Sequence, residues 1–194
     1  NVVLSLDADF LNTSAFPGFI PYSRAFTSRR KLAEDAPMNR LYAVESFHTT
    51  AGALSDNRLP LRASDILPFA AALASAVGVA GVSAPTQEWT QDQQKFLAAL
   101  SKDLKANSGA SIVLPGEQQP PELHILAAQM NQALGNVGKT IVYTDPVELV
   151  PTDQLGGLKQ LLADMNAGKV DLLVILEGNP AYNTPVDLGF ELAM

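Results

Sequence analysis

Short apolar runs, separated by longer segments with helix signals, constrain the fold of this chain more than any other feature. Residues 2–6 read Val-Val-Leu-Ser-Leu, and comparable runs lie at 40–44, 110–114, 140–143 and 170–176. Such runs are typical of strands that are buried on both faces of a parallel sheet. Strand and helix signals alternate along the chain, so the sequence predicts an α/β fold, with a mostly parallel, Rossmann-like sheet flanked by helices.

The helix signals between these runs are local and specific. Thr90 and Gln93 have the spacing of a capping box, which predicts a helix that continues to about residue 106. Pro120-Pro121 predicts the start of a further helix that ends near Gly135.

The domain organisation has two interpretations. Residues 1–194 fit one α/β domain, or two pseudo-repeated lobes (1–78 and 107–194) joined by the small-residue segment and helix at 79–106. The chain begins at Asn1 inside a strand-like run, so we expect an internal fragment of a longer protein.

Composition excludes several classes of function. The chain carries 20 Asp and Glu against 13 Lys and Arg, a net charge of -7. Because a negatively charged chain repels the phosphate backbone, we expect no nucleic-acid partner. It has no cysteine, which excludes disulfides, thiolate metal sites and a thiol nucleophile within these residues. No apolar run is long enough to span a bilayer, so we expect no direct membrane insertion.

Acidic and amide side chains follow most of the predicted strands. Because ligands of open parallel sheets bind beyond the carboxyl ends of the strands, these side chains are candidates for accepting hydrogen bonds from a ribose. The alternative, which the pattern favours, is that they are ordinary solvated loop residues. The candidates are Asp7, Asp9, Glu45, Glu117, Asp145, Glu177 and Asn179.

Motifs for phosphate binding and catalysis are absent from the sequence. Neither G-x-G-x-x-G nor the P-loop pattern occurs, and there is no G-x-S-x-G elbow. His48 and His124 are the only imidazoles, and neither lies at metal-ligand spacing from other candidate ligands. We therefore expect no catalytic residue and no metal site in this chain.

Three stretches carry a family resemblance when taken together and in order. They are residues 1–10 (NVVLSLDADF), residues 44–62 and residues 173–180 (LVILEGNP). They resemble the molybdopterin oxidoreductase family, in which a strand precedes D-P-R-x-T-x-T-A and A-D-x-H-L-x-I-R-P-G-T-D, and a later strand precedes G-G-N-P. The resemblance implies a formate dehydrogenase/DMSO reductase type of domain in a parent oxidoreductase.

Four stretches (38–46, 56–62, 135–140 and 178–182) are similar to one subfamily. This is the molybdopterin-oxidoreductase-like iron–sulfur subunit of bacterial alternative complex III, a membrane quinol:electron acceptor oxidoreductase. The similarity implies iron–sulfur clusters elsewhere in the parent and other subunits of that electron-transfer complex as partners. It also implies a location on the periplasmic face of the cytoplasmic membrane and loss of the molybdenum cofactor.

Departures from the family pattern agree with that loss. Glu45-Ser46-Phe47 stands where the family has D-P-R, so the arginine that would grip a phosphate is missing. The first hypothesis is therefore a cofactor-free structural domain, inactive by itself. The second is a domain that binds the guanosine arm of molybdopterin guanine dinucleotide through Asp7, Glu45, Gly178 and Asn179. The least favoured is an unrelated nucleotide-binding or transferase domain.

Overall fold

The computed structural model describes residues 1–12, 18–31, 38–145, 150 and 153–194. The chain divides into two units, Asn1–Tyr143 and Thr144–Met194, and each is described by itself.

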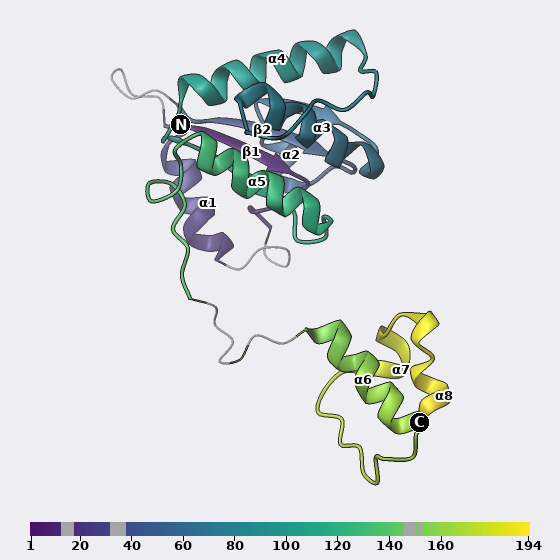
Figure 1. Ribbon diagram of the computed structural model, residues 1–194. Coiled ribbons are helices and arrows are strands. Elements are labelled where there is room, and N and C mark those ends of the chain that lie inside the picture. The colour runs from purple at the N-terminus through teal and green to yellow at the C-terminus, as the bar shows by residue number, and fades with distance from the viewer. Residues whose placement is uncertain (13–17, 32–37, 146–149, 151–152) are drawn as a thin grey trace. The chain divides into compact units, whose positions relative to one another are not determined.

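A four-stranded parallel sheet forms the centre of the first unit (Figure 1). The strand order is β3-β2-β1-β4, so the chain starts at an inner strand, builds outwards on one side and returns to the other. Val2 of β1 is level with Arg40 of β2 and Ser111 of β4. The predicted α/β fold with a parallel sheet flanked by helices is confirmed. The strands are β1 (Val2–Leu6), β2 (Arg40–Glu45), β3 (Asn57–Pro60) and β4 (Ser111–Pro115).

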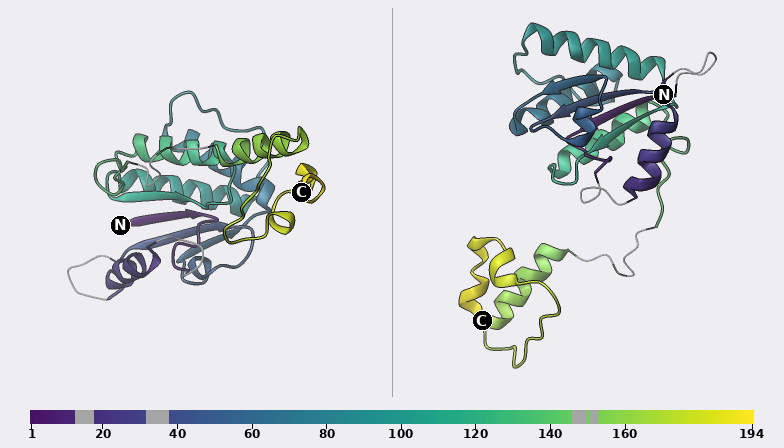
Figure 2. Two further views of the ribbon diagram at one scale, coloured as in Figure 1. Left: turned by 90° about the horizontal axis from the view of Figure 1, so that it is seen from below. Right: turned by 180° about the vertical axis from the view of Figure 1, so that it is seen from behind.

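Helices cover both faces of this sheet. Because alternate strand residues point to opposite faces, each face has its own hydrophobic core. Val2, Leu4 and Leu6 pack with residues of α3, α4 and α5, whereas Val3 packs in a smaller cluster that contains residues of α1 and α2. Figure 2 shows α4 and α1 on opposite sides of the strands. The helices are α1 (Phe19–Ser28), α2 (Thr50–Ala53), α3 (Ala63–Val77), α4 (Gln91–Ala106) and α5 (Pro121–Ala133).

Local signals define α4 as predicted. Thr90 accepts a hydrogen bond from the Gln93 amide, and the Gln93 side chain accepts one from the Thr90 amide, which completes the capping box. A bidentate ion pair between Arg40 and Asp103 then ties β2 to α4, and the Tyr42 hydroxyl donates to the same carboxylate at 3.1 Å. Burial, followed by the Asp103 charge, raises the pKa of Tyr42.

A second ion pair ties α1's C-terminal turn to the segment before β3. Arg30 donates to both Asp56 oxygens, at 2.9 and 2.6 Å, and the Leu41 amide donates to the same carboxylate at 2.8 Å. Burial alone would raise the pKa of Asp56. The hydrogen bonds outweigh burial and hold that pKa below its ordinary value of 3.8.

The predicted strand at 140–143 is wrong, because the sheet stops at β4. Asn131 on α5 accepts from the Val113 amide at 3.0 Å and donates to the Val113 carbonyl at 2.9 Å. The Thr140 hydroxyl donates to the Ser111 carbonyl at 2.6 Å. These side chains occupy outward backbone groups that a fifth strand would need, and Ile141 makes only an isolated bridge to Val137.

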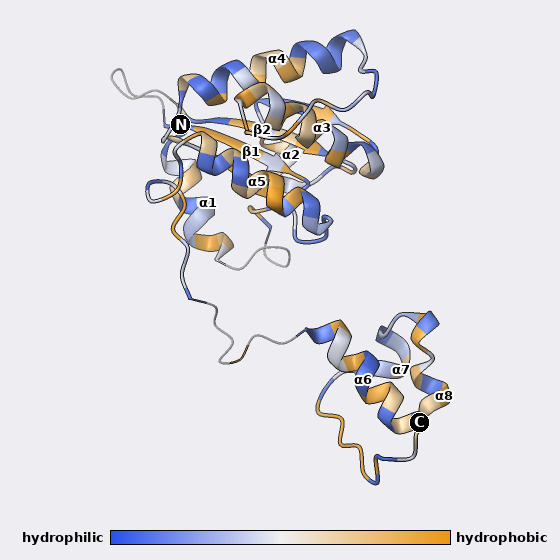
Figure 3. Ribbon diagram, viewed as in Figure 1, coloured by the Kyte–Doolittle hydropathy of each residue, from blue (hydrophilic) through white to orange (hydrophobic). Residues whose placement is uncertain are grey.

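The predicted strand at 170–176 is also wrong. This segment, in the second unit, pairs with no strand among the described residues. Most of its side chains are exposed, Leu172 by 80% and Leu176 by 85%, and Val170 and Leu173 are half-buried. Figure 3 shows it as an apolar stretch on the connection after α6. Apolar composition alone does not make a strand, because strand backbone groups need a neighbouring strand to bond.

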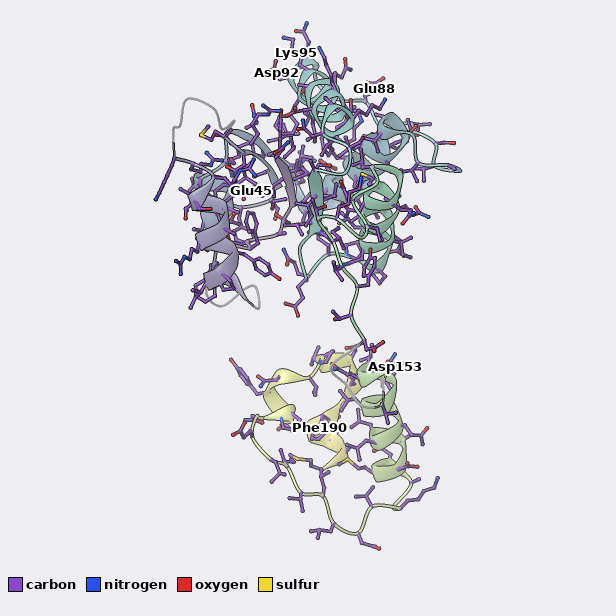
Figure 4. All side chains as sticks on the ribbon, turned by 90° about the vertical axis from the view of Figure 1, so that its left-hand side faces the viewer. Glu45, Glu88, Asp92, Lys95, Asp153 and Phe190 are labelled. Atoms are coloured by element: carbon purple, nitrogen blue, oxygen red, sulfur yellow. The ribbon has the colours of Figure 1, made fainter. Side chains whose placement is uncertain are left out.

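The second unit is helical in the residues described. Its core is small: the α6 residue Leu162 and the α8 residue Phe190 are its buried hydrophobic side chains. Figure 4 labels Asp153 and Phe190; the Asp153 carboxylate caps α6 by accepting from the Gly156 amide at 2.9 Å. The elements are α6 (Gln154–Asn166), α7 (Pro180–Asn183), the 3-10 turn Val186–Leu188 and α8 (Phe190–Ala193).

Candidate functional site

The candidate site lies at the carboxyl edge of the sheet, where the chain path reverses direction between β1 and β4. β1 leads towards β2 on one side, while β4 lies on the other side, so the loops that follow β1 and β4 diverge. Ligands of open α/β sheets bind at such a point. A cavity of about 250 Å³ lies there. Its lining is Asp7, Ala8, Asp9, Asn12, Phe47, Gly116, Glu117 and Gln118.

Asp7 directly follows β1 and joins the loops that follow three strands. Its carboxylate accepts from the Ser46 amide at 2.8 Å, the Ser46 hydroxyl at 3.0 Å and the Gln119 side chain at 2.9 Å. Its backbone carbonyl accepts from Gln118 at 3.0 Å. Asp7 has a φ of 56° and is 5% exposed, so its neighbours hold it in a conformation uncommon for a residue with a side chain.

Gly116 explains how the β4 loop approaches so closely. A Cβ atom at this position would lie 2.3 Å from the Asp7 carbonyl oxygen. Because that neighbour is backbone and cannot swing away, only glycine fits. The Gly116 amide donates to the Leu6 carbonyl at 2.8 Å, which closes the loop against the end of β1.

Glu45 ends β2 and is 1% exposed (Figure 4). The Thr49 hydroxyl donates to one carboxylate oxygen at 2.6 Å, and Arg58 on β3 forms an ion pair with the other. Gly52 on α2 makes room for the carboxylate, since a Cβ there would lie 1.9 Å from Oε1. Glu45 thus joins β2, α2 and β3 from a position shielded from solvent.

The first turn of α2 is also satisfied from within the chain. Asp9 accepts from the Ala51 amide at 2.8 Å, and the Thr49 hydroxyl accepts from the Gly52 amide at 2.9 Å. A second oxygen of Asp9 accepts from Asn12 at 3.0 Å. Free amides at a helix start are the groups that bind phosphate, and here side chains of the same chain occupy them.

Gly178 and Asn179 lie in the second unit, in a tight turn before α7. Glu177 and Gly178 both have positive φ angles, 57° and 77°. The Asn179 carbonyl accepts from the amides of Tyr182 and Asn183, at 3.0 and 2.8 Å, which starts the helix. Asp7 and Glu45 belong to the first unit, so a cofactor site made of all four residues stays a prediction.

The remaining polar candidates are peripheral to this edge. His48 is exposed beyond β2, and His124 is exposed on α5. Across the ranges that the structure describes, no three His, Asp or Glu side chains gather where they could hold a metal ion. Among the helices in those ranges, none combines the length and the apolar character needed to cross a membrane.

Sequence reasoning identified Asp7 and Glu45 but missed their partners. Ser46 and Gln119 follow different strands, and Arg58 lies on a third, so nothing local links them to a carboxylate. Two glycines were the signals that could have located this site. At Gly52 the Glu45 carboxylate, and at Gly116 the Asp7 carbonyl oxygen, lies where a side chain would otherwise be.

The fold and its edge cavity define the class: a Rossmann-like α/β protein with a crevice at the strand-order reversal. Comparison with protein-family models finds no match, and comparison with curated proteins finds none either.

Proposed function

We propose that this chain is a structural domain of a molybdopterin-oxidoreductase-like subunit in a respiratory quinol-oxidising electron-transfer complex. In this proposal the domain binds no cofactor, and its parent carries iron–sulfur clusters elsewhere. The parent associates with other subunits of the complex on the periplasmic face of the cytoplasmic membrane. One observation supports the structural role: Asp7, Asp9 and Glu45 direct their carboxylates to donors of this same chain.

The edge residues fit a dinucleotide cofactor poorly. A ribose hydroxyl needs an accessible acceptor, but Asp7 already accepts three hydrogen bonds on two oxygens, and Glu45 is ion-paired and shielded from solvent. A pyrophosphate needs positive charge or free amides. Among the residues that the structure describes, the cavity lining instead has three acids, Asp7, Asp9 and Glu117, and no Lys or Arg.

The acids serve a structural purpose that accounts for their positions. Four parallel strands end at one edge, and their following loops need fixed paths. Asp7 joins the loops after β2 and β4 to β1, and Glu45 joins α2 and β3 to β2. Buried polar networks of this kind favour one arrangement of loops when every member is paired.

The second candidate is the guanine dinucleotide-binding domain of an active molybdenum oxidoreductase. The observation in its favour is the place of the cavity, at the strand-order reversal where such sheets bind nucleotides, with the exposed ring of Phe47 in its lining. The two candidates differ in whether the parent protein holds molybdenum.

The test is purification of the full-length parent from membranes in mild detergent. Metal analysis, nucleotide extraction and mass spectrometry of co-purifying subunits are the readouts. We expect iron and stoichiometric membrane subunits, without molybdenum or a guanine nucleotide. A molybdenum enzyme purified by the same procedure controls for cofactor loss. Stoichiometric molybdenum with guanine nucleotide would replace this proposal by the second candidate.

A further inference from the structure

Residues 170–176 of the second unit are an exposed apolar run with the side-chain alternation of a strand (Figure 3). Its outward row is exposed, Leu172 by 80%, Val174 by 66% and Leu176 by 85%, whereas Leu173 is half-buried. Alternate side chains of an extended backbone point in opposite directions. The pattern is therefore that of a strand with one side against its own unit and the other side in solvent.

The backbone of this run has no partner of its own. From residue 170 to residue 178, no amide or carbonyl forms a hydrogen bond with a described residue. Positive φ angles at Gly168 and Glu177 delimit the run at its two ends. A strand is stable only when a neighbouring strand pairs with its backbone groups. The run therefore has the side chains and the free backbone of a strand but lacks the neighbour.

The strands described in this chain do not supply that neighbour. The described elements of the second unit are helical. The outer edge of β4 is closed, because Asn131 occupies both outward backbone groups of Val113 and Pro115 has no amide hydrogen. At the other edge of the sheet, β3 has only four residues and includes Pro60, and such short, proline-containing edges resist further pairing. The same run of a second copy, by contrast, has its backbone groups free.

The run is complementary to itself when two copies lie antiparallel about a twofold axis at Leu173. Lys169 of each copy then lies opposite Glu177 of the other, and both side chains are exposed. Opposite charges directly across an antiparallel pair stabilise it. Asp171 lies opposite Ile175 and so meets no like charge.

Other registers lose this match. Directly opposite side chains lie on the same face of a sheet, so a shift has to keep the outward row outward. With the axis at Val174, Asp171 would lie opposite Glu177, which brings like charges together. With the axis at Leu172, Lys169 would lose Glu177. A parallel pair in register would place each charge beside its own counterpart.

Lys169 can make this contact without leaving its own unit. Its Nζ atom lies 3.1 Å from Asp164 Oδ1 on α6, and the side chain is still 68% exposed. An ammonium group has three donors, so one can remain on Asp164 while another reaches across the pair of strands.

We propose that the second unit is an interface between two copies of this chain, in which residues 170–176 pair as antiparallel strands with Leu173 on the twofold axis. The second copy supplies the backbone hydrogen bonds that the run lacks, and Leu172 packs across the pair on Val174 of that copy. This interface goes beyond the structural role proposed above, because it concerns the second unit alone and stands whether or not the parent binds a cofactor.

A single introduced cysteine tests the register, because the chain has no cysteine of its own. Leu173→Cys places two thiols opposite each other, with Cα atoms about 4.5–5.5 Å apart, within the range of about 4.4–6.8 Å that a disulfide spans. Leu176→Cys is the matched control: it is more exposed, but its two copies would lie about 20 Å apart along the strands. In an oxidising glutathione buffer we expect the whole chain to form a disulfide-linked dimer with Leu173→Cys and little with Leu176→Cys.

A charge exchange tests the same register without touching the half-buried side chain. Lys169→Glu and Glu177→Lys should each raise the dissociation constant of the dimer by about two- to thirtyfold in sedimentation equilibrium, the ratio for two cross-strand ion pairs. The double variant exchanges the two charges and should restore the constant of the unmodified chain. Lys159→Glu makes the same change of charge on the exposed surface of α6 and should leave the constant unchanged.

Any of three results would overturn the proposal. These are an unmodified chain that stays monomeric up to its solubility limit, cross-linking of Leu176→Cys as fast as that of Leu173→Cys, and a double charge variant that associates no better than the single ones. Circular dichroism shows whether each variant keeps its helices. If Leu173→Cys loses them, the charge exchange decides alone.

Discussion

Removal of Arg58 from the Glu45 ion pair provides a sharp test of the structural role of the carboxyl edge. Arg58→Met keeps an unbranched apolar side chain but removes the guanidinium. Glu45 would then keep only its bond from Thr49 while remaining 1% exposed. Breaking a buried pair by removing one partner costs about 3–5 kcal/mol. The Arg58 side chain is 31% exposed, so water moderates the loss and we expect about 2–3 kcal/mol.

Urea unfolding followed by circular dichroism measures this loss. With a slope of about 1–3 kcal/mol per molar urea, the midpoint should fall by roughly 1–2 M. Glu45→Gln keeps the shape of the side chain and removes its charge. The double variant should lose less stability than the sum of the single variants, with a coupling of about 1 kcal/mol or more.

The opposite pattern would refute this reasoning. A carboxylate that is held for a ligand destabilises the free protein, so its removal commonly raises stability. If Glu45→Gln raised the free energy of unfolding, or if Arg58→Met left the midpoint unchanged, Glu45 would not be a structural residue.

Three further predictions address other contacts of the fold. Asn131→Ala exposes the outward backbone groups of β4. We expect the free energy of unfolding in urea to fall by about 2–4 kcal/mol and the variant to self-associate more than the unmodified chain in sedimentation velocity. Unchanged association and stability would show that Asn131 does not block the edge of the sheet. Gly52→Ala brings a methyl group against the Glu45 carboxylate and should cost about 1–3 kcal/mol, whereas the control Gly157→Ala, with open space around it on α6, should be neutral or slightly stabilising. The hydrogen bonds of Asp56 hold its pKa in the folded protein below 3.8, so the stabilisation from Asp56 is complete above pH 3.8 and is lost as the pH falls through that lower pKa. In Asp56→Asn, the free energy of unfolding should therefore fall less steeply as the pH is lowered in the acid range. An unchanged dependence on pH would contradict this assignment.

Much of the fold was predictable because its signals are local. The apolar runs at 2–6 and 40–44 are buried strands because both faces of the sheet are covered, and the Thr90 capping box fixes the start of α4 from residues three apart. The runs at 140–143 and 170–176 are also mainly apolar, but neither forms a ladder of backbone hydrogen bonds with a described strand. A strand forms only where a neighbouring strand pairs with its backbone groups. Asn131 occupies the outer backbone groups of β4, but nothing in the sequence indicates that this polar helix residue ends the sheet.

The candidate site was predictable only in part, for a related reason. The ends of the predicted strands locate Asp7 and Glu45. Whether these carboxylates bind a ligand or hold the fold depends on which groups donate hydrogen bonds to them. Gln119 reaches Asp7 from 112 residues away, and Arg58 reaches Glu45 from a separate strand. These contacts come from the strand order, which the sequence pattern leaves open.

Titration of the chain with guanosine diphosphate, by calorimetry and amide chemical shifts, tests most directly whether the carboxyl edge serves the fold alone. We expect no saturable heat and no shifts at Asp7, Ser46 or Gly116. Saturable binding with shifts at those residues, weakened by Phe47→Ala, would contradict it.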